Sequence, residues 1–287
     1  MIRSLNLDPM FVPVPYPETP YSLERFNGGE VHFKLGGGID FAKTEKVIIT
    51  HRITSSEHIM QILMAKEALQ HKKIKSFDLV IPYIPYARQD RRCAEGEAFS
   101  MKVFADLINT QGFDHVVTVD AHSDVAPALI NNCVNMDNHQ YVQQALHKLG
   151  FGDTSDQRMI LVVPDAGASK KSNKLFYETK DFLDIVQCDK VRDTHTGALS
   201  GFKVFADDLK GKNCIIVDDI CDGGRTFVGM AEKLKEKGAG NIYLFVTHGI
   251  FSAGFDKLAE YFTGIACTNS FKDIEENDLI KQIKIQV

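Results

Sequence analysis

Short apolar runs alternate with amphipathic segments along the whole chain. Six runs rich in Val and Ile predict strands, over residues 46–52, 77–86, 115–122, 159–167, 213–219 and 241–249. Three segments between them place apolar residues at helical spacing, and we predict helices over residues 55–73, 100–112 and 225–240. Continuous apolar strands separated by helices are typical of parallel sheets that are covered on both faces.

The predicted helix over residues 100–112 shows how these faces are assigned. Its apolar stripe contains Val103, Phe104, Leu107 and Ile108, which we expect to be buried together, and the helix is expected to stop at Gly112. The stripe predicts that this helix lies against a sheet rather than alone in solvent.

The strand and helix series occurs twice in the chain. We therefore predict an α/β fold of two tandem domains, residues 1–138 and 139–287, each a mainly parallel sheet flanked by helices, which share one cleft. The similarity of the halves is architectural rather than literal, so a single large sheet is the alternative. Ligands bind at the carboxyl ends of strands in such sheets, and polar residues that follow each strand are therefore candidates for chemistry.

Composition narrows the range of partners and compartments. The net charge is −5 and the basic residues are dispersed, so we expect no nucleic-acid partner. The six cysteines are widely spaced without a CxxC pair, which favours reduced thiols over disulfides or zinc. The first residues contain no long apolar run, and we expect a cytoplasmic protein with no signal peptide and no membrane contact.

Residues 214–226, CIIVDDICDGGRT, place three acids and two glycines where a predicted strand meets a predicted helix. Asp218 and Asp219 end the strand, and the turn that follows consists of Asp222, Gly223, Gly224, Arg225 and Thr226. The N–H groups at a helix N-terminus attract phosphate, while the acids would accept hydrogen bonds from sugar hydroxyls or hold a cation. A solvated acidic loop with a Gly-Gly turn and a helix cap is the ordinary alternative.

This stretch resembles the phosphoribosyl diphosphate loop of type I phosphoribosyltransferases and of ribose-phosphate diphosphokinases. Two positions depart from it, since Cys221 stands where an aliphatic residue is usual and Gly223 where a small hydroxyl residue is usual. The run YARQDRR, residues 86–92, resembles the ATP-binding segment of the diphosphokinases and is not expected in a simple phosphoribosyltransferase. Residues 99–122, 162–171 and 243–252 resemble further diphosphokinase segments in the same order.

The chain is thus identified as a short, divergent member of the ribose-phosphate diphosphokinase (phosphoribosyl diphosphate synthetase) family. The resemblance implies two tandem type I phosphoribosyltransferase-like domains, with ATP segments in the first and the ribose-phosphate and catalytic loops in the second. It assigns ATP binding to Phe26, Glu30, Arg88, Gln89, Asp90, Arg91 and His122. A solvated charge cluster is the alternative for residues 88–92, and a hairpin turn is the alternative for residues 26–30.

The resemblance also implies a magnesium site and a catalytic pair. His122 and Asp165 are expected on the side of the Mg²⁺ that is bound to ATP, and Asp165 is expected next to the ribose phosphate as well. Magnesium prefers oxygen ligands and retained water, so a His122 contact is the weaker assignment. Lys190 and Arg192, in a polar stretch that we interpret as an exposed connection, match the pair that contacts the transferred phosphates.

The predicted reaction is Mg-ATP-dependent transfer of a diphosphoryl group to the anomeric 1-hydroxyl of ribose 5-phosphate, with release of AMP. Gly223 and Arg225 suggest an alternative acceptor, a 5′-substituted ribose such as ADP-ribose, in NAD salvage. The alternatives from other classes are a type I phosphoribosyltransferase and a non-catalytic regulatory subunit, and the intact Lys190 and Arg192 argue against the latter. Residues 26–30 imply a homodimer or higher homo-oligomer, while the short C-terminal stretch argues against a hexamer with allosteric control.

Overall fold

The computed structural model describes residues 1–152, 158–192 and 199–287, with the backbone alone for residues 190–192, 199 and 200. The chain divides into two compact units, one of residues 1–137 with 284–287 and the other of residues 138–283. Each unit has its own main sheet, so the alternative of a single large sheet is wrong. No helix among these residues combines the length and the apolar character that crossing a bilayer requires.

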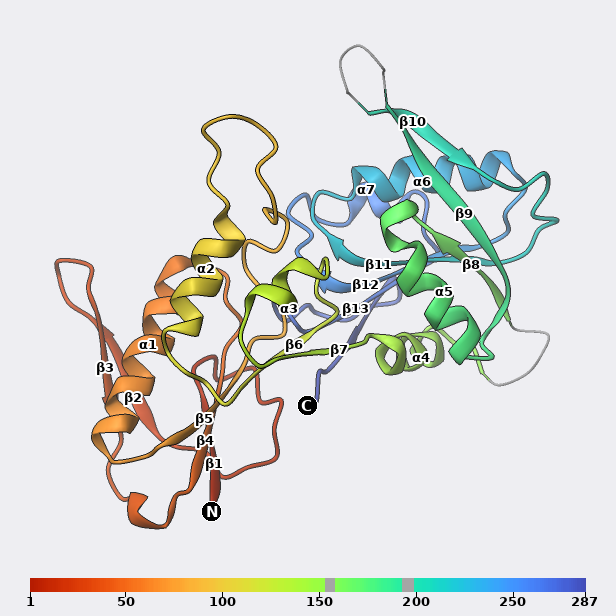
Figure 1. The fold of residues 1–287 in the computed structure, drawn as a ribbon. Coiled ribbons are helices and arrows are strands. Elements are labelled where there is room, and N and C mark those ends of the chain that lie inside the picture. The colour runs from red at the N-terminus through yellow and green to blue at the C-terminus, as the bar shows by residue number, and fades with distance from the viewer. Residues whose placement is uncertain (153–157, 193–198) are drawn as a thin grey trace. The chain divides into compact units, whose positions relative to one another are not determined.

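The first unit is built on a five-stranded sheet in which all neighbouring strands are parallel (Figure 1). In spatial order its strands are β1 (Ile2–Asn6), β4 (Lys46–Thr50), β5 (Ser76–Val80), β6 (His115–Val119) and β7 (Cys133–Met136). Its helices are α1 (Ser56–His71), α2 (Ser100–Asn109) and α3 (Val125–Leu129), with a short helix η1 (Phe41–Lys43) before β4. A separate antiparallel hairpin, β2 (Tyr21–Arg25) and β3 (Val31–Leu35), contacts α1 through β3.

The face that α2 buries differs from the predicted one. Met101, Phe104, Ala105 and Ile108 are buried in the core of the first unit, whereas Val103 is 65% exposed and Leu107 is 38% exposed. The buried residues follow an i, i+3, i+4, i+7 pattern, and this stripe lies one position away from the predicted one. Helix α2 also ends at Asn109, three residues before Gly112.

The second unit has a seven-stranded sheet that is parallel except for β10. In spatial order its strands are β10 (Leu199–Val204), β9 (Phe182–Arg192), β8 (Met159–Val163), β11 (Cys214–Cys221), β12 (Ile242–Gly249), β13 (Gly264–Thr268) and β14 (Ile280–Ile283). Its helices are α4 (His139–Lys148), η3 (Ala166–Ala168), α5 (Ser169–Glu178), α6 (Arg225–Glu236) and α7 (Asp256–Ala259). The interpretation of residues 187–201 as an exposed connection is therefore wrong for residues 187–192, which continue β9, and for residues 199–201, which begin β10.

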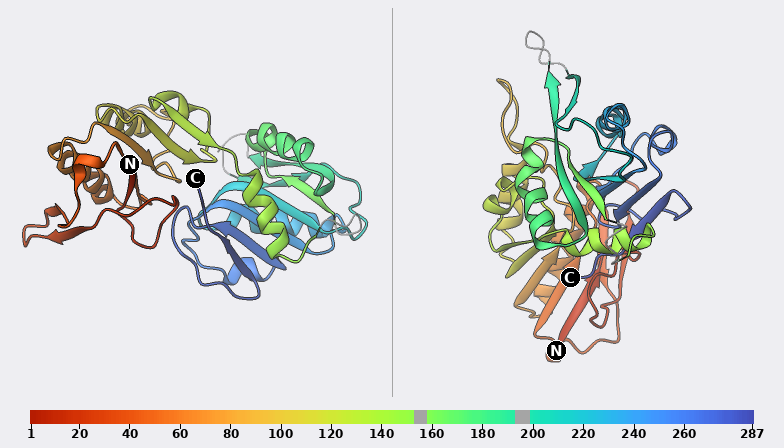
Figure 2. Two further views of the ribbon diagram at one scale, coloured as in Figure 1. Left: turned by 90° about the horizontal axis from the view of Figure 1, so that it is seen from below. Right: turned by 90° about the vertical axis from the view of Figure 1, so that its right-hand side faces the viewer.

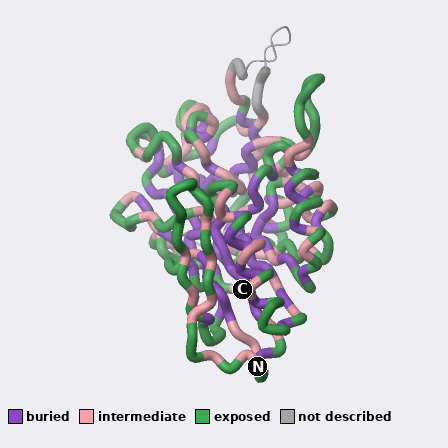
Figure 3. Tube along the Cα trace, turned by 90° about the vertical axis from the view of Figure 1, so that its left-hand side faces the viewer, coloured by how far each residue is buried: buried purple, intermediate pink, exposed green. Residues whose placement is uncertain are grey.

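Helices cover both faces of this second sheet. Helix α5 contacts β8 and β9, and α4 contacts β12, β13 and β14. Helix α6 buries Phe227, Met230, Ala231 and Leu234 in a cluster with side chains of β8, β11 and β12. Figure 2 shows α5 and α6 on opposite sides of the strands, and Figure 3 shows buried residues in the interior of the molecule and exposed residues along its outer loops. Because β8 and β11 are parallel neighbours, the polar residues that follow them lie at one edge of the sheet.

Candidate functional site

In the first unit, the predicted ATP-binding residues follow two neighbouring strands. Residues 88–91 come after β5 and His122 comes after β6, and the two strands pair in parallel. Tyr86, which precedes the charged run, has φ +63°, an uncommon conformation for a bulky residue. Arg88, Gln89, Arg91 and His122 are exposed. The structure therefore presents these polar side chains to solvent at one edge of the sheet.

A hydrogen bond ties the two loops together. The hydroxyl of Ser123 donates to Asp90 Oδ2 over 2.7 Å, and Asp90 is only partly exposed. Because Ser123 directly follows His122, the bond fixes the position of the loop after β6 relative to residues 88–91. The predicted nucleotide-binding residues of this edge thus form one connected group of loops.

Phe26 and Glu30 flank the turn of the β2–β3 hairpin, so the turn interpretation of this segment is correct. The N–H of Phe26 donates to the carbonyl of Glu30 over 2.9 Å, and the N–H of Gly29 donates to the carbonyl of Phe26 over 2.8 Å. The Phe26 ring is 58% exposed, with its centroid 5.3 Å from that of His32. An exposed aromatic ring at a hairpin tip is available to stack on a planar group.

In the second unit, acidic residues gather at the carboxyl ends of β8 and β11. Strand β11 runs to Cys221, two residues beyond its predicted end, but its pairing with β8 stops at Ile216. Asp218 and Asp219 therefore lie beyond the end of β8, where Asp165 begins the next turn. Asp165 Oδ1 accepts a hydrogen bond of 3.1 Å from the N–H of Ala168 and caps η3.

The electrostatics of this edge are those of crowded carboxylates. Burial raises the pKa of Asp218 well above its usual value, and the nearby charges of Asp219 and Asp165 raise it further. The N–H of Asp219 donates to Asp218 Oδ1 over 2.9 Å, which offsets part of the effect. The edge thus brings several carboxylates together, and their oxygen atoms suit a cation or the hydroxyl groups of a sugar.

The turn between β11 and α6 has the geometry of an anion site at a helix N-terminus. Gly224 precedes α6 with φ +77° and ψ −10°, and α6 is twelve residues long. Cys221 is fully buried in the core beside this turn, and burial raises the pKa of its thiol to about 12. The cysteine therefore fills the position of an aliphatic residue and stays protonated at neutral pH.

Replacing Gly224 by alanine is expected to strain this turn. A left-handed φ costs an L-residue about 1–2 kcal/mol, and the added Cβ would lie 3.2 Å from Leu258 Cδ2. We expect the melting temperature to fall by roughly 2–6 °C in a thermal unfolding experiment. Gly223→Ala is the matched control, because the only described atom within 4 Å of a Cβ there is Ser252 Oγ, at 4.0 Å. Equal melting temperatures for the two variants would contradict the strain.

The proposed catalytic pair lies in β9, which pairs with β8. The side chains of Lys190 and Arg192 are outside the described residues, so their contacts stay a prediction. His122 belongs to the first unit and Asp165 to the second, and their shared role at magnesium is likewise a prediction.

Known protein families match segments in both units of the chain. Residues 14–112 match the family described as the N-terminal domain of ribose phosphate pyrophosphokinase, and residues 198–285 match the phosphoribosyl synthetase-associated domain. The ribose-phosphate pyrophosphokinase of Mycoplasmopsis pulmonis is 30% identical over 233 residues, which cover 80% of this chain and 70% of the relative. The chain belongs to the ribose-phosphate pyrophosphokinase family.

Further comparisons agree with this membership. The ribose-phosphate pyrophosphokinase of Maricaulis maris is 30% identical over 238 residues, 82% of this chain and 74% of the relative. The crystal structure of phosphoribosylpyrophosphate synthetase from Mycobacterium smegmatis superposes with a TM-score of 0.80 at 24% identity, covering 99% of this chain and 94% of that one. The predicted fold class, two tandem phosphoribosyltransferase-like domains, is confirmed. So is the predicted enzyme class, a ribose-phosphate diphosphokinase-like transferase.

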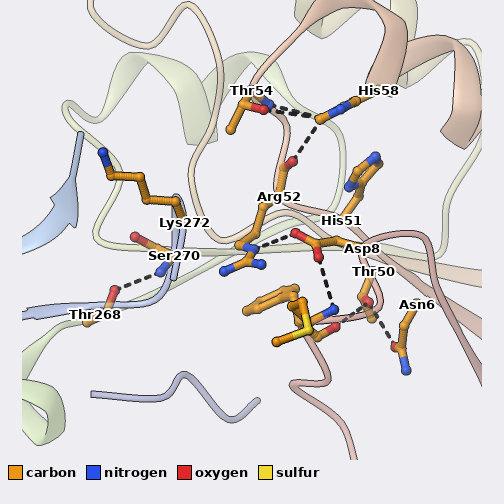
Figure 4. Close-up of polar contacts among 12 residues, drawn as sticks. Asn6, Asp8, Thr50, His51, Arg52, Thr54, His58, Thr268, Ser270 and Lys272 are labelled. Carbon is orange, nitrogen blue, oxygen red and sulfur yellow. Dashed lines mark hydrogen bonds and ion pairs between the residues drawn. The ribbon is translucent and has the colours of Figure 1, made fainter. Parts of the chain in front are cut away.

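Sequence reasoning missed a buried polar cluster in the first unit of this pyrophosphokinase-family chain. Arg52 Nε lies 2.6 Å from Asp8 Oδ2, and the Asp8 carboxylate and the Arg52 side chain face each other in Figure 4. His51 Nε2 lies 2.9 Å from Gln61 Oε1, and the His51 ring stacks on that of His58 with centroids 4.4 Å apart. No single sequence signal marks this cluster, because its members come from the segments that follow β1 and β4 and from α1, and they meet only in the fold.

Proposed function

We propose that the chain transfers the diphosphoryl group of Mg-ATP to the anomeric 1-hydroxyl of ribose 5-phosphate and releases AMP. The observation that carries the proposal is the acidic edge of the second unit, in a chain that belongs to this family. There, Asp218 and Asp219 lie beside the N-terminus of a long helix. The curated relatives are named for the same activity. We further propose a cytoplasmic homodimer or higher homo-oligomer, as the family resemblance implies.

The second unit would hold the acceptor. Asp218 and Asp219 would accept hydrogen bonds from the ribose hydroxyls, and the N–H groups of residues 222–226 would donate to the 5′-phosphate. The N-terminal end of the α6 dipole would favour the phosphate dianion. In this assignment the carboxylates bind the sugar hydroxyls and the backbone N–H groups bind the phosphate.

The first unit would hold the nucleotide. Arg88 offers a planar fork of donors, Gln89 offers an amide, and the exposed Phe26 ring offers a stacking surface. Arg91 would add positive potential near the polyphosphate. The bond between Ser123 and Asp90 would keep these loops ordered when the nucleotide binds.

The donor set fits a magnesium ion that arrives with ATP. The carboxylates of Asp218 and Asp219 lie near that of Asp165, and Mg²⁺ prefers oxygen ligands with retained water. Asp165 would contact the ion directly and His122 through water. The ion supplies charge neutralisation of the polyphosphate, which is the role that divalent cations have in phosphoryl transfer.

The reaction itself would need no covalent intermediate. The anomeric hydroxyl would attack the β-phosphorus in line, the bond from that phosphorus to the α-phosphate oxygen would break, and AMP would leave. Lys190 and Arg192 would neutralise the charge that develops on the transferred phosphates.

A specific observation supports ADP-ribose as a second candidate acceptor. A Cβ at Gly223 would have only Ser252 Oγ within 4 Å among the described residues, and Arg225 is exposed at the start of α6. The space beside Gly223 and the cation of Arg225 would suit a diphosphate in place of a terminal phosphate. The enzyme would then act in NAD salvage.

An acceptor panel tests both candidates. The purified chain is incubated with Mg-ATP and either ribose 5-phosphate, ADP-ribose or unphosphorylated ribose, and AMP is quantified. Turnover of ribose 5-phosphate alone supports the first candidate, and turnover of ADP-ribose alone supports the second. Failure to release AMP with any acceptor would overturn the proposal, and release of diphosphate from phosphoribosyl diphosphate and a base would indicate a phosphoribosyltransferase.

Ser123→Ala is expected to weaken nucleotide binding without changing acceptor binding. A hydrogen bond to a charged group is worth about 1.5–3 kcal/mol, so the KM for ATP should rise at least about 10-fold. Ser123→Thr keeps the hydroxyl and serves as the control. If steady-state kinetics with varied ATP gave the same KM for both variants, the bond from Ser123 to Asp90 would have no role in ordering the nucleotide loops.

A further inference from the structure

A turn that follows β12 contacts residues 222–226 of the second unit, which we call the phosphate loop. The N–H groups of Ile250 and Phe251 both donate to the carbonyl of Cys221, over 2.9 and 3.0 Å. The N–H of Ser252 donates to the carbonyl of Asp222 over 3.1 Å. Residues 250–252 therefore extend the pairing of β11 with β12, which reaches Cys221 and Gly249, onto the loop itself.

This turn adopts an uncommon conformation that its surroundings enforce. Phe251 has φ +45°, in the left-handed region that bulky residues avoid. Its buried ring packs against Phe255 with centroids 4.6 Å apart. On the other side, a Cβ at Gly249 would lie 2.3 Å from the Phe251 ring, so the ring position requires glycine there. Packing thus holds the turn in one conformation and determines where Ser252 lies.

The side chain of Ser252 contacts the phosphate loop a second time. Its hydroxyl donates to Asp222 Oδ1 over 2.6 Å. Ser252 is exposed, and burial therefore does not oblige its hydroxyl to find a protein partner. The bond instead selects one orientation of the Asp222 carboxylate, directly before the glycines of the loop.

The same hydroxyl lies beside the position where this chain departs from its family. Gly223 stands where a small hydroxyl residue is usual, and a Cβ at Gly223 would lie 4.0 Å from Ser252 Oγ. No other described atom lies within 4 Å of that Cβ position. The hydroxyl of Ser252, which follows β12, thus lies close to the position that a side-chain hydroxyl at residue 223 would occupy.

We propose that Ser252 is a positioning residue for the 5′-phosphate group of the acceptor. Its hydroxyl fixes the Asp222 carboxylate and takes the place of the side-chain hydroxyl that Gly223 lacks. The loop therefore keeps one conformation in which its N–H groups face the phosphate. The inference rests on the proposed function of residues 222–226 and adds a residue from outside that loop.

Kinetics of Ser252→Ala test the assignment. We expect the KM for the phosphorylated acceptor to rise about 10-fold, while kcat, the KM for ATP and the melting temperature stay at wild-type values. Ser252→Thr should keep the wild-type KM because it retains a hydroxyl. Ala253→Ser is the matched control on the same exposed turn and should have no effect.

A second change separates positioning from general loop damage. Gly223→Ser has room for its side chain, and in the Ser252→Ala background it should return the acceptor KM to within about 3-fold of wild type. An acceptor KM for Ser252→Ala equal to that of the wild type, or no recovery in the double variant, overturns the inference.

Calorimetric titration with ribose 5-phosphate and with ADP-ribose, without ATP, distinguishes failure of the Ser252 assignment from failure of the proposed function. A wild-type chain that binds an acceptor, together with a Ser252→Ala variant of equal affinity, refutes only the role of Ser252. A wild-type chain that binds neither acceptor refutes both proposals.

Discussion

Asp218→Asn is expected to make the ligand-free protein more stable while removing most of its activity. Because the pKa of Asp218 is raised, the folded protein holds a proton there more tightly than the unfolded chain does. Stability is therefore lost as the pH rises from the usual aspartate range through the raised pKa. At neutral pH the side chain is ionised in the unfolded chain, so folding must either bury that charge or take up a proton, and the neutral amide of Asn removes this cost.

We expect a higher free energy of unfolding and a higher melting temperature for Asp218→Asn than for the wild type at neutral pH. The gain should disappear below about pH 4, where the aspartate is protonated in both states. The kcat/KM for the acceptor should fall at least 100-fold, since hydrogen bonds from the ribose hydroxyls to a charged oxygen are lost.

Asp207→Asn is the matched control, because Asp207 is exposed on the same unit and outside the site. Its melting temperature and its activity should both match the wild type. A lower melting temperature for Asp218→Asn at neutral pH would show that the acidic edge is not under electrostatic repulsion.

The second large effect concerns His51 and the response of the fold to acid. The pKa of His51 is lowered to about 4, mainly by burial and also by the nearby charges of His58 and Arg52, against the raising effects of Gln61 and Asp8. Its Nδ1 is buried without a hydrogen-bond partner among the described residues. Protonation would thus place an unpaired charge in the cluster of Figure 4.

The unfolded chain takes up a proton at this histidine near pH 6.5, whereas the folded protein takes it up only near pH 4. Stability is therefore lost as the pH falls between these values, by about 2 kcal/mol between pH 7 and pH 5. Urea unfolding curves at several pH values measure the loss. His51→Gln should flatten the pH dependence between pH 7 and pH 5, although it lowers stability at neutral pH by changing a packed side chain.

His71→Gln is the control, since His71 is exposed at the end of α1. It should leave the pH dependence of stability unchanged. If His51→Gln and the wild type lost the same free energy of unfolding between pH 7 and pH 5, another group would control the acid response of the first unit.

The central strands and the two best-marked helices were predictable because local pattern and tertiary packing agree there. Helix α1 and helix α6 lie within their predicted ranges, and all six predicted strands are present. The predicted buried stripe of α2 was right for Phe104 and Ile108 and wrong for Val103 and Leu107. Val103 and Phe104 are both apolar, so hydrophobicity alone did not decide which one faces the core. In the fold, Phe104 packs into the core and Val103 stays exposed.

The hydrogen bonds that position the candidate site residues could not be predicted from the sequence. The bond between Ser123 and Asp90 spans 33 residues, and that between Ser252 and Asp222 spans 30. Serine is common in exposed turns, and no local signal separates these two from the others. Motif resemblance identifies the residues that contact ligands, whereas their positioning depends on which loops the sheet order brings together.

The first unit is discontinuous in sequence, because residues 284–287 belong with residues 1–137. The N–H of Val287 donates to the carbonyl of Pro13 over 3.0 Å, and Ile285 is 2% exposed. During synthesis the ribosome releases the start of the chain first, yet these last partners are made only after the entire second unit. The amino-terminal unit therefore completes its native contacts last, and a nascent chain remains without them until translation has reached residue 287.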